Sequence, residues 1–223
     1  MTDLNGRDLR IEYDDHYTTI QRHLDHLKKR IEDSGALLEG NSFYHHNTLD
    51  LCTDLYKKQI NLYWTGKQAI SKICEIGFNA GHSTMLFLLG RDATPLDLTI
   101  FDIGHHPYIR PCLEYIKGEF PHVNVDYIEG DSTTTMPKWI EDHPHVLESY
   151  DVIHVDGGHS EHCIHHDMMN SDRLLKKGGL LVVDDISIPY INYLVDVYVS
   201  SGRYKDVDVL STKVYSHRIL RKL

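Results

Sequence analysis

Acidic side chains stand at the end of each of five short apolar stretches in the second part of this chain. The apolar stretches predict buried strands of a parallel sheet, in which ligands bind beyond the carboxyl ends of the strands. A carboxylate accepts hydrogen bonds from hydroxyl and amino groups and also binds hard cations. One acidic strand end can arise by chance, but five in succession indicate a functional site. The acidic residues are Glu75, Asp102, Asp131, Asp156 and the pair Asp184-Asp185.

The first of these strand ends, in residues 73–83, is the most informative. Its sequence, Ile-Cys-Glu-Ile-Gly-Phe-Asn-Ala-Gly-His-Ser, predicts a buried strand, a tight turn at Gly77 and Gly81, and the start of a helix. A dinucleotide-binding fingerprint would need glycine at positions 79 and 82, which hold asparagine and histidine. Glu75 repels a diphosphate but suits a ligand that carries an amino group and a sulfonium.

The pattern E-x-G-x-x-x-G-x-S over residues 75–83 resembles motif I of class I S-adenosylmethionine-dependent methyltransferases, and the resemblance extends over residues 70–220. It implies that S-adenosylmethionine binds here, with its ribose hydroxyls on Asp102 and its adenine amino group on Asp131-Ser132. A carboxylate can accept both hydroxyls, glycine lets the backbone approach the ligand, and a helix N-terminus suits the ligand's carboxylate. The residues expected to bind the cofactor are Glu75, Gly77, Phe78, Asn79, Gly81, His82, Ser83, Asp102, Asp131, Ser132 and Asp156.

Three of the aspartates predict a cation site, because Asp156 follows one predicted strand and Asp184 and Asp185 follow its neighbour. Adjacent strands lie about 4.8 Å apart, so the carboxylates would repel one another and their pKa values would rise. A divalent cation that prefers oxygen ligands, Mg²⁺ or Ca²⁺, removes this repulsion. The set resembles that of metal-dependent O-methyltransferases of the catechol type and of the macrocin type, which act on sugar hydroxyls. The resemblance implies a Mg²⁺ ion that binds the acceptor oxygens and lowers their pKa.

His159, three residues after Asp156, is the expected general base, and these two residues form the expected catalytic pair. The catechol-type enzymes place a lysine at this position, and histidine is better matched to proton transfer near neutral pH. Two alternatives stay open. His159 begins a helix without a catalytic role, or it joins a zinc site along that helix. The zinc site would contain His159, His162, Cys163 and His166.

The composition indicates one globular protein and argues against some partners. With 223 residues, 41% of them hydrophobic, the chain can bury a large core. A formal net charge of −10 argues against binding to a nucleic-acid backbone. Four scattered cysteines without a C-x-x-C pattern indicate a reduced, cytoplasmic protein. No apolar run reaches the ~18 residues needed to cross a membrane.

The predicted elements fall into two parts. Residues 1–68 form an N-terminal helical cap, with helices over 15–33 and 48–64. Residues 69–223 form an α/β domain with a Rossmann-like, doubly wound, mostly parallel seven-stranded sheet whose last strand is antiparallel. Aromatic side chains of the cap either cover the site as a lid or pack on the sheet, namely Phe43, Tyr44, Tyr63 and Trp64. The strands are expected over residues 72–76, 98–103, 123–128, 152–155, 180–183, 207–210 and 213–220.

The expected activity is methyl transfer from S-adenosylmethionine to an ionised hydroxyl of a small molecule or glycan, by in-line displacement. Neither nucleic acid nor a membrane is an expected partner, and a homodimer stays open. One alternative is a protein that binds S-adenosylmethionine without catalysis, and another is an N-methyltransferase without a metal. An NAD-linked oxidoreductase is disfavoured by the missing glycines.

Overall fold

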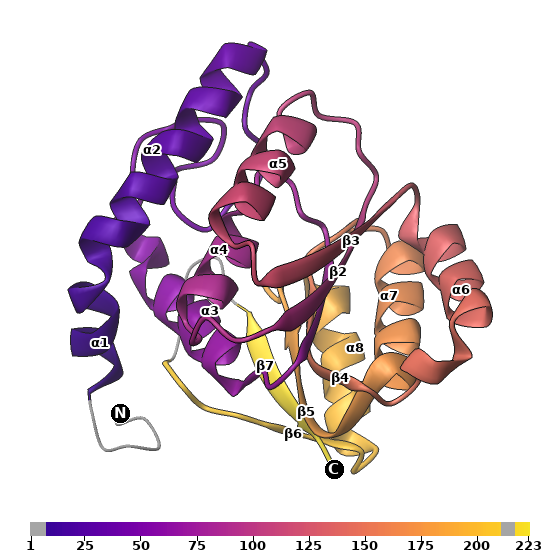
Figure 1. Ribbon diagram of the computed structural model, residues 1–223. Helices are drawn as coiled ribbons and strands as arrows, with labels where there is room; N and C mark the ends of the chain where they lie inside the picture. Colours follow the sequence, from indigo (N-terminus) through magenta and orange to yellow (C-terminus); the bar gives the residue numbers. More distant parts are fainter. Residues whose placement is uncertain (1–7, 211–216) are drawn as a thin grey trace.

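The computed structural model describes residues 8–210 and 217–223, which form a seven-stranded sheet with helices on both faces (Figure 1). The strand order is β3-β2-β1-β4-β5-β7-β6. Neighbours from β3 to β5 run parallel, and β7 runs antiparallel to β5 and β6. The Rossmann-like α/β fold predicted from the sequence is therefore confirmed. The strands are β1 (Lys72–Ile76), β2 (Leu96–Asp102), β3 (Val123–Glu129), β4 (Tyr150–Val155), β5 (Leu175–Val183), β6 (Tyr204–Asp206) and β7 (Arg218–Lys222).

The strand order reverses between β1 and β4. From β1 the chain adds β2 and β3 on one side, and it then returns to place β4 on the other side of β1. Ile76 pairs with Val155, so β1 and β4 end at the same level. The loops that leave these two strands diverge, and ligands bind beyond the carboxyl ends of the strands at such a point in open parallel sheets.

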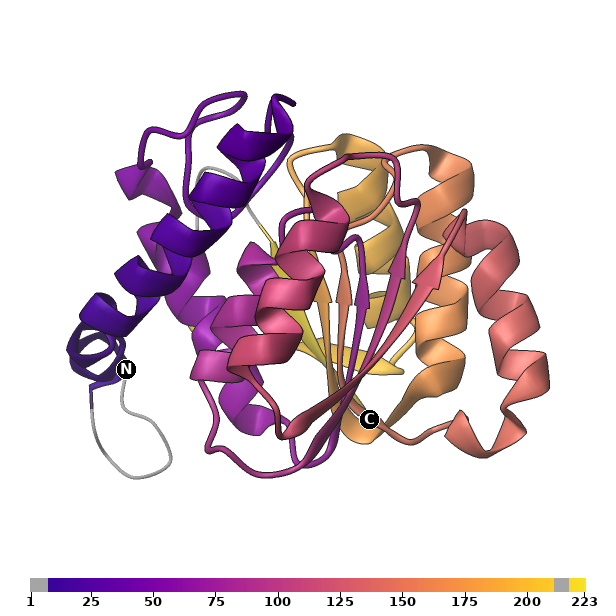
Figure 2. The ribbon, with the colours of Figure 1, turned by 45° about the horizontal axis from the view of Figure 1, so that its top comes forward.

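Helices cover both faces of the sheet (Figure 2). Helices α4 and α5 lie on one face, and α6, α7 and α8 lie on the other. Strand side chains alternate between the faces and contribute to two separate hydrophobic cores. The bounds are α4 (His82–Leu89), α5 (Ile109–Glu119), α6 (Ser132–Asp142), α7 (Glu161–Leu174) and α8 (Pro189–Ser200), with a short 3-10 helix η2 (Pro144–Val146) before β4.

The N-terminal helices α1 (Leu9–Asp15), α2 (Tyr17–Ser34) and α3 (Tyr56–Gln68) pack on the face that carries α4 and α5 (Figure 2). Their apolar side chains share one core with that face of the sheet. The backbones of α3 and α4 approach closely, because a Cβ atom on Gly66 would lie 2.1 Å from the carbonyl oxygen of Phe87. This contact fixes α3 against the sheet.

The prediction of a cap helix over 48–64 is wrong at its start. Helix α3 begins at Tyr56, after the 3-10 helix η1 (Thr53–Leu55). The segment before η1 pairs with the chain upstream, since the N–H group of Cys52 donates to the carbonyl of Phe43 at 2.8 Å. Helical spacing of leucines cannot reveal this competing pairing.

The first closing strand, β6, precedes the predicted 207–210, and β7 shares residues 218–220 with the predicted 213–220 but extends two residues beyond it. In β7, Arg218 pairs with Val183 of β5, and its guanidinium bonds both carboxylate oxygens of Asp206 from β6 at 2.9 and 2.8 Å. Residues 211–216, which the second predicted strand includes, lie outside the described residues. Within the described ranges, the helices are too short or too polar to cross a membrane.

Candidate active site

The turn after β1 brings the ends of β1 and β4 into backbone contact. Gly77 has a φ of +91°, and a Cβ atom there would lie 2.1 Å from the carbonyl oxygen of Asp156. Gly81 has a φ of +80°, and a Cβ atom there would lie 2.7 Å from the ring of Phe78. Glycine is required at both positions. Helix α4 begins at the next residue, so its free N–H groups lie at this strand end.

Asp102, predicted to bind the ribose, holds the glycine turn in shape. Its Oδ2 accepts the N–H groups of Phe78 at 2.8 Å and Asn79 at 2.9 Å, and its Oδ1 accepts the N–H group of Gly104 at 2.7 Å. Asn79 in turn accepts the hydroxyl of Tyr108 at 2.7 Å. These bonds use both lone pairs of Oδ2 and one of Oδ1, so one lone pair remains, and contact between Asp102 and a ribose hydroxyl stays a prediction.

The carboxylate of Glu75 is fully buried beneath the turn. Ser83 donates its hydroxyl to Oε1 at 2.5 Å, Thr84 donates to Oε2, and a ring nitrogen of His154 lies 3.1 Å from Oε1. Burial opposes the charge of His154, but the bond to Glu75 and the nearby Asp156 raise its pKa overall. Glu75 thus ties α4 to β4, and its direct contact with a ligand stays a prediction.

The ring of His82 is buried under the cap. Its centroid lies 5.7 Å from that of Phe43 and 5.5 Å from that of Tyr44. Burial lowers the pKa of His82 to about 3. Phe43, Tyr44 and Tyr63 are buried and Trp64 is half-buried, so the first three pack the cap onto the domain and do not form an open lid.

Asp131 caps the N-terminus of α6. Its Oδ1 accepts the N–H group of Thr133 at 2.9 Å and the hydroxyl of the same residue at 2.8 Å, and these bonds lower the pKa of Asp131. Gly130 donates its N–H group to the carbonyl of Asp102 at 2.9 Å, which joins the ends of β3 and β2. Asp131 is exposed and Ser132 half-buried, so both remain accessible to an adenine amino group, and that role stays a prediction.

Asp156 and Asp184 meet at the ends of β4 and β5, around the buried ring of His154. Its Nε2 lies 4.0 Å from a carboxylate oxygen of each aspartate. The ammonium of Lys58, from α3, pairs with Oδ2 of Asp184. Burial and the charge of Asp184 raise the pKa of Asp156. Burial also opposes the charge of Asp184, but Lys58, His217 and His154 lower its pKa overall.

His159 and Asp185 form a second, more exposed pair beside this cluster. Nε2 of His159 lies 2.7 Å from Oδ2 of Asp185, and the two side chains are 58% and 32% exposed. Asp185 has a φ of +55°, a conformation that few residues other than glycine adopt. The bond to Asp185 raises the pKa of His159. A histidine oriented by a carboxylate and open to solvent is suited to take a proton from a hydroxyl.

At the ends of β4 and β5, two groups of side chains have the spacing of a metal site and are called metal-like groups below. Asp156 belongs to both. The first contains His154 and Asp184, and the second contains His159 and Asp185. Within each group the possible ligand atoms lie within 4.8 Å of one another. Carboxylate oxygens suit Mg²⁺, but among the described residues neither group holds all three predicted aspartates, and a lysine already pairs with the first. The residues therefore fit the predicted ion only in part.

The alternative zinc site on α7 does not form in the described part of the chain, since no metal-like group there includes His162, Cys163 or His166. A third group, Glu39 with His105 and His106, joins the cap to the loop after β2. It shares no residue with the other two groups, and its residues are mostly exposed.

Sequence reasoning missed two members of the site, Lys58 and His154. Lys58 stands between Leu55 and Leu62 at helical spacing, on the apolar face of α3. A lysine in such a position is costly unless it has a buried partner, which is a signal in itself. His154 likewise interrupts an apolar strand, and a buried imidazole there needs a hydrogen-bond partner.

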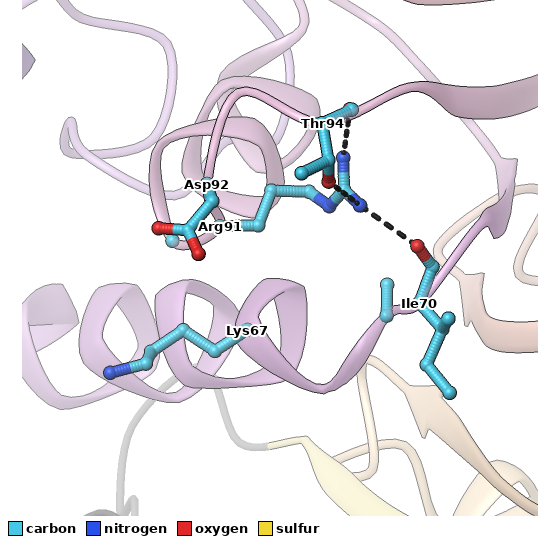
Figure 3. A pocket seen from close by; sticks show the side chains of 7 residues that line it. Lys67, Ile70, Arg91, Asp92 and Thr94 are labelled. Carbon is cyan, nitrogen blue, oxygen red and sulfur yellow. Dashed lines mark hydrogen bonds between the residues drawn. The ribbon is translucent and has the colours of Figure 1, made fainter.

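A small cavity of about 160 Å³ lies at the opposite end of β1 (Figure 3). Arg91 fills much of its wall and donates to the carbonyl of Ile70 at 3.0 Å and to the carbonyl of Thr94 at 2.9 Å. Because these partners lie at the amino ends of the strands, the cavity is separate from the site described above. Its lining residues are Lys67, Ala69, Ile70, Gly90, Arg91, Asp92 and Thr94.

The strand order, the glycine turn after β1 and the acidic strand ends define the class I methyltransferase fold. A family model described as a methyltransferase domain matches residues 74–186, which is just over half of the chain. The chain belongs to this family. Among curated proteins, no sequence matches the chain.

Solved structures show the same fold at low sequence identity. An O-methyltransferase from Bacillus cereus in complex with SAH is 16% identical, with a TM-score of 0.61 over 89% of this chain and 90% of that one. TomG from Streptomyces achromogenes, an O-methyltransferase of tomaymycin synthesis in complex with SAM, is 17% identical, with a TM-score of 0.55 over 74% and 79%. CalS11, a TDP-rhamnose 3'-O-methyltransferase of calicheamicin biosynthesis, is 18% identical, with a TM-score of 0.58 over 74% and 76%.

Proposed function

We propose that this protein is an S-adenosylmethionine-dependent O-methyltransferase that acts on a hydroxyl of a small molecule or sugar. One observation carries the proposal: the pair of His159 and Asp185 lies beside Asp156, whose backbone contacts the glycine turn at Gly77. A proton acceptor thus adjoins the strand end where the cofactor is expected. The similar structures support the proposal, since they are O-methyltransferases and one of them, CalS11, is a TDP-rhamnose 3'-O-methyltransferase.

The residues around the turn would hold the cofactor, through the N-terminus of α4 and the strand ends at Asp102 and Asp131. When bound, S-adenosylmethionine supplies an electrophilic methyl group. The protein contributes mainly by holding the acceptor oxygen in line with that group. The glycine turn and α4, which would position the cofactor, are held by hydrogen bonds to Asp102 and Glu75.

His159 would take the proton of the acceptor hydroxyl. Because Oδ2 of Asp185 accepts the hydrogen bond from Nε2–H, the lone pair that accepts the proton is on Nδ1. Asp185 then stabilises the imidazolium that forms. Asp156, shared by both groups of side chains, is placed to accept a hydrogen bond from the acceptor.

The experiment is a methyl-release assay over a panel of phenolic, sugar and amine acceptors, with wild type and His159→Gln. The variant should lose roughly 10²-fold or more in kcat with a hydroxyl acceptor, while binding of S-adenosylhomocysteine stays unchanged. The exposed His165 of α7, changed to Gln, is the matched control and should keep wild-type turnover.

Three results would contradict the proposal: full turnover by His159→Gln, methylation of amines alone, or failure to bind S-adenosylhomocysteine. Binding without methyl release from any acceptor would favour a non-catalytic binding protein. The predicted Mg²⁺ enters as a separate arm of the assay, run with EDTA and with added Mg²⁺.

A further inference from the structure

Lys58 places a positive charge inside the carboxylate cluster at the ends of β4 and β5. Its ammonium pairs with Asp184, and the two side chains are only 7% and 1% exposed. Asp156, in the same cluster, also attracts this charge. A buried lysine is costly unless it is paired, so the pairing is a specific feature of the fold.

The neighbours of Lys58 on α3 fix its position. Gln59 accepts the hydroxyl of Tyr13 at 2.8 Å and donates to the carbonyl of Ser42 at 2.9 Å. Asn61 donates to the carbonyl of Leu210 at 2.9 Å and accepts its N–H group at 3.0 Å. The close contact of α3 with α4 adds a steric limit. These bonds hold the backbone of α3 in place, so Lys58 enters the cluster from a fixed helix.

The first metal-like group is a poor site for a divalent ion while this ammonium is present. Mg²⁺ binds a carboxylate oxygen at about 2.1 Å, which would put it a few ångströms from the ammonium on Asp184. Even at an effective dielectric constant of 20, a unit charge and a double charge about 4 Å apart repel by roughly 8 kcal/mol. The lysine and the metal are therefore alternatives.

The second metal-like group, Asp156 with His159 and Asp185, contains the histidine that takes the proton in the proposed function. His159 and Asp185 already bond each other at 2.7 Å. A ring nitrogen that ligates a metal cannot also accept a proton, and the carboxylate that orients the ring would have to turn to the ion. Under the proposed function, this group works without a metal.

We propose that Lys58 is the resident cation of this site, in place of a divalent metal, and that methyl transfer proceeds without a divalent ion. This inference rests on the proposed function. Lys58 is a positioning residue, because it is buried and contacts Asp184 instead of substrate. An ammonium does not chelate two oxygens as a metal ion does, so the acceptor needs only one hydroxyl and not two adjacent ones.

The test is a titration of the full chain with Mn²⁺ and with Mg²⁺, followed by calorimetry, with S-adenosylhomocysteine present. Wild type should bind neither ion below about 1 mM. Lys58→Met keeps the length of the side chain and leaves the carboxylates without a cation, so it should bind Mn²⁺ at least about tenfold tighter than wild type. Lys57→Met, which removes an exposed charge one residue away, should behave as wild type.

Binding of one Mg²⁺ per chain to wild type below about 1 mM would overturn the inference. This measurement uses only the wild-type protein, so it tests the inference even if Lys58→Met does not fold. Equal ion affinity of wild type and a folded Lys58→Met would also overturn it. The titration needs no acceptor, so it stands apart from the methyl-release assay. Turnover that EDTA abolishes and Mg²⁺ restores would refute this inference and leave the proposed function intact.

Discussion

His82 should make the protein less stable in acid, because the fold buries it as a neutral ring. The residue is 3% exposed, lies against Phe43 and Tyr44, and its Nε2 has no hydrogen-bond partner among the described residues. Burial lowers its pKa from 6.5 to about 3. The unfolded chain therefore takes up a proton as the pH falls through 6.5, which the folded chain does only near pH 3. Folding is progressively disfavoured in that window.

The perturbation is His82→Leu, which keeps an apolar side chain of similar size but cannot bind a proton. With these two pKa values, the ring lowers the free energy of unfolding of the wild-type protein by about 2.5 kcal/mol more at about pH 4.5 than at about pH 7. The variant lacks this cost. The free energy of unfolding of His82→Leu, measured relative to that of wild type, should thus rise by about 2.5 kcal/mol when the pH is lowered from about 7 to about 4.5.

The assay is urea unfolding of both proteins at the two pH values, with S-adenosylhomocysteine binding measured at neutral pH. Ile140→Val, in the other hydrophobic core, is the control, and it should lower stability by about 0.5–1.5 kcal/mol at both pH values. Parallel pH profiles for His82→Leu and wild type would refute the reasoning, since the ring would then be equally free to take up a proton in both states.

Four further results are expected. Gly77→Ala should weaken binding of S-adenosylhomocysteine at least about tenfold by calorimetry, because the new Cβ would meet the carbonyl of Asp156 at 2.1 Å. Asp131→Ala should lower the free energy of unfolding in urea by about 1 kcal/mol through loss of the α6 cap. Asp151→Asn should cost about 1.5–3 kcal/mol in urea unfolding, because Oδ2 accepts three backbone N–H groups, at 2.9, 2.6 and 2.8 Å, and Oδ1 pairs with the partly exposed Lys176. Burial alone would raise the pKa of Asp151, but these bonds lower it overall, so the loss should be full above about pH 4 and fade as the pH falls further. Acceptors with one hydroxyl should be methylated as fast as matched acceptors with two adjacent hydroxyls, measured as initial rates of methyl release.

The sheet could be predicted because each buried strand is a short apolar run that ends in an acid or a glycine. The run at Lys72–Ile76 matches β1 at both ends, and the strand after it differs by two residues at its start and one at its end. The closing strands could not be placed in the same way. β7 pairs with β5, which lies more than 30 residues earlier, and with the short β6, and such pairing leaves no periodic pattern in the sequence.

The candidate site was predictable in position but not in its contacts. Topology alone brings Asp156 and Asp184 to neighbouring strand ends, so their convergence follows from the sequence. The partners of each carboxylate depend on packing from outside the sheet. Glu75 bonds three protein side chains, and Asp184 meets a lysine from a helix more than 120 residues earlier in the chain. The spacing of residues along the sequence does not reveal contacts between side chains so far apart in the chain.

Helix α3 therefore does more than cover the sheet. A cap that only excluded water would present apolar side chains to the strand ends, and α3 instead presents Lys58 to Asp184 and Asn61 to the buried His217. Both contacts act on the same charges, since Lys58 and His217 each lower the pKa of Asp184. Displacement of α3 would remove the ammonium that pairs with Asp184, and the pKa of Asp184 would then rise. The packing of α3 on the domain and the protonation of Asp184 are thus coupled, and a substitution that weakens the packing of α3 should also change the pKa of Asp184.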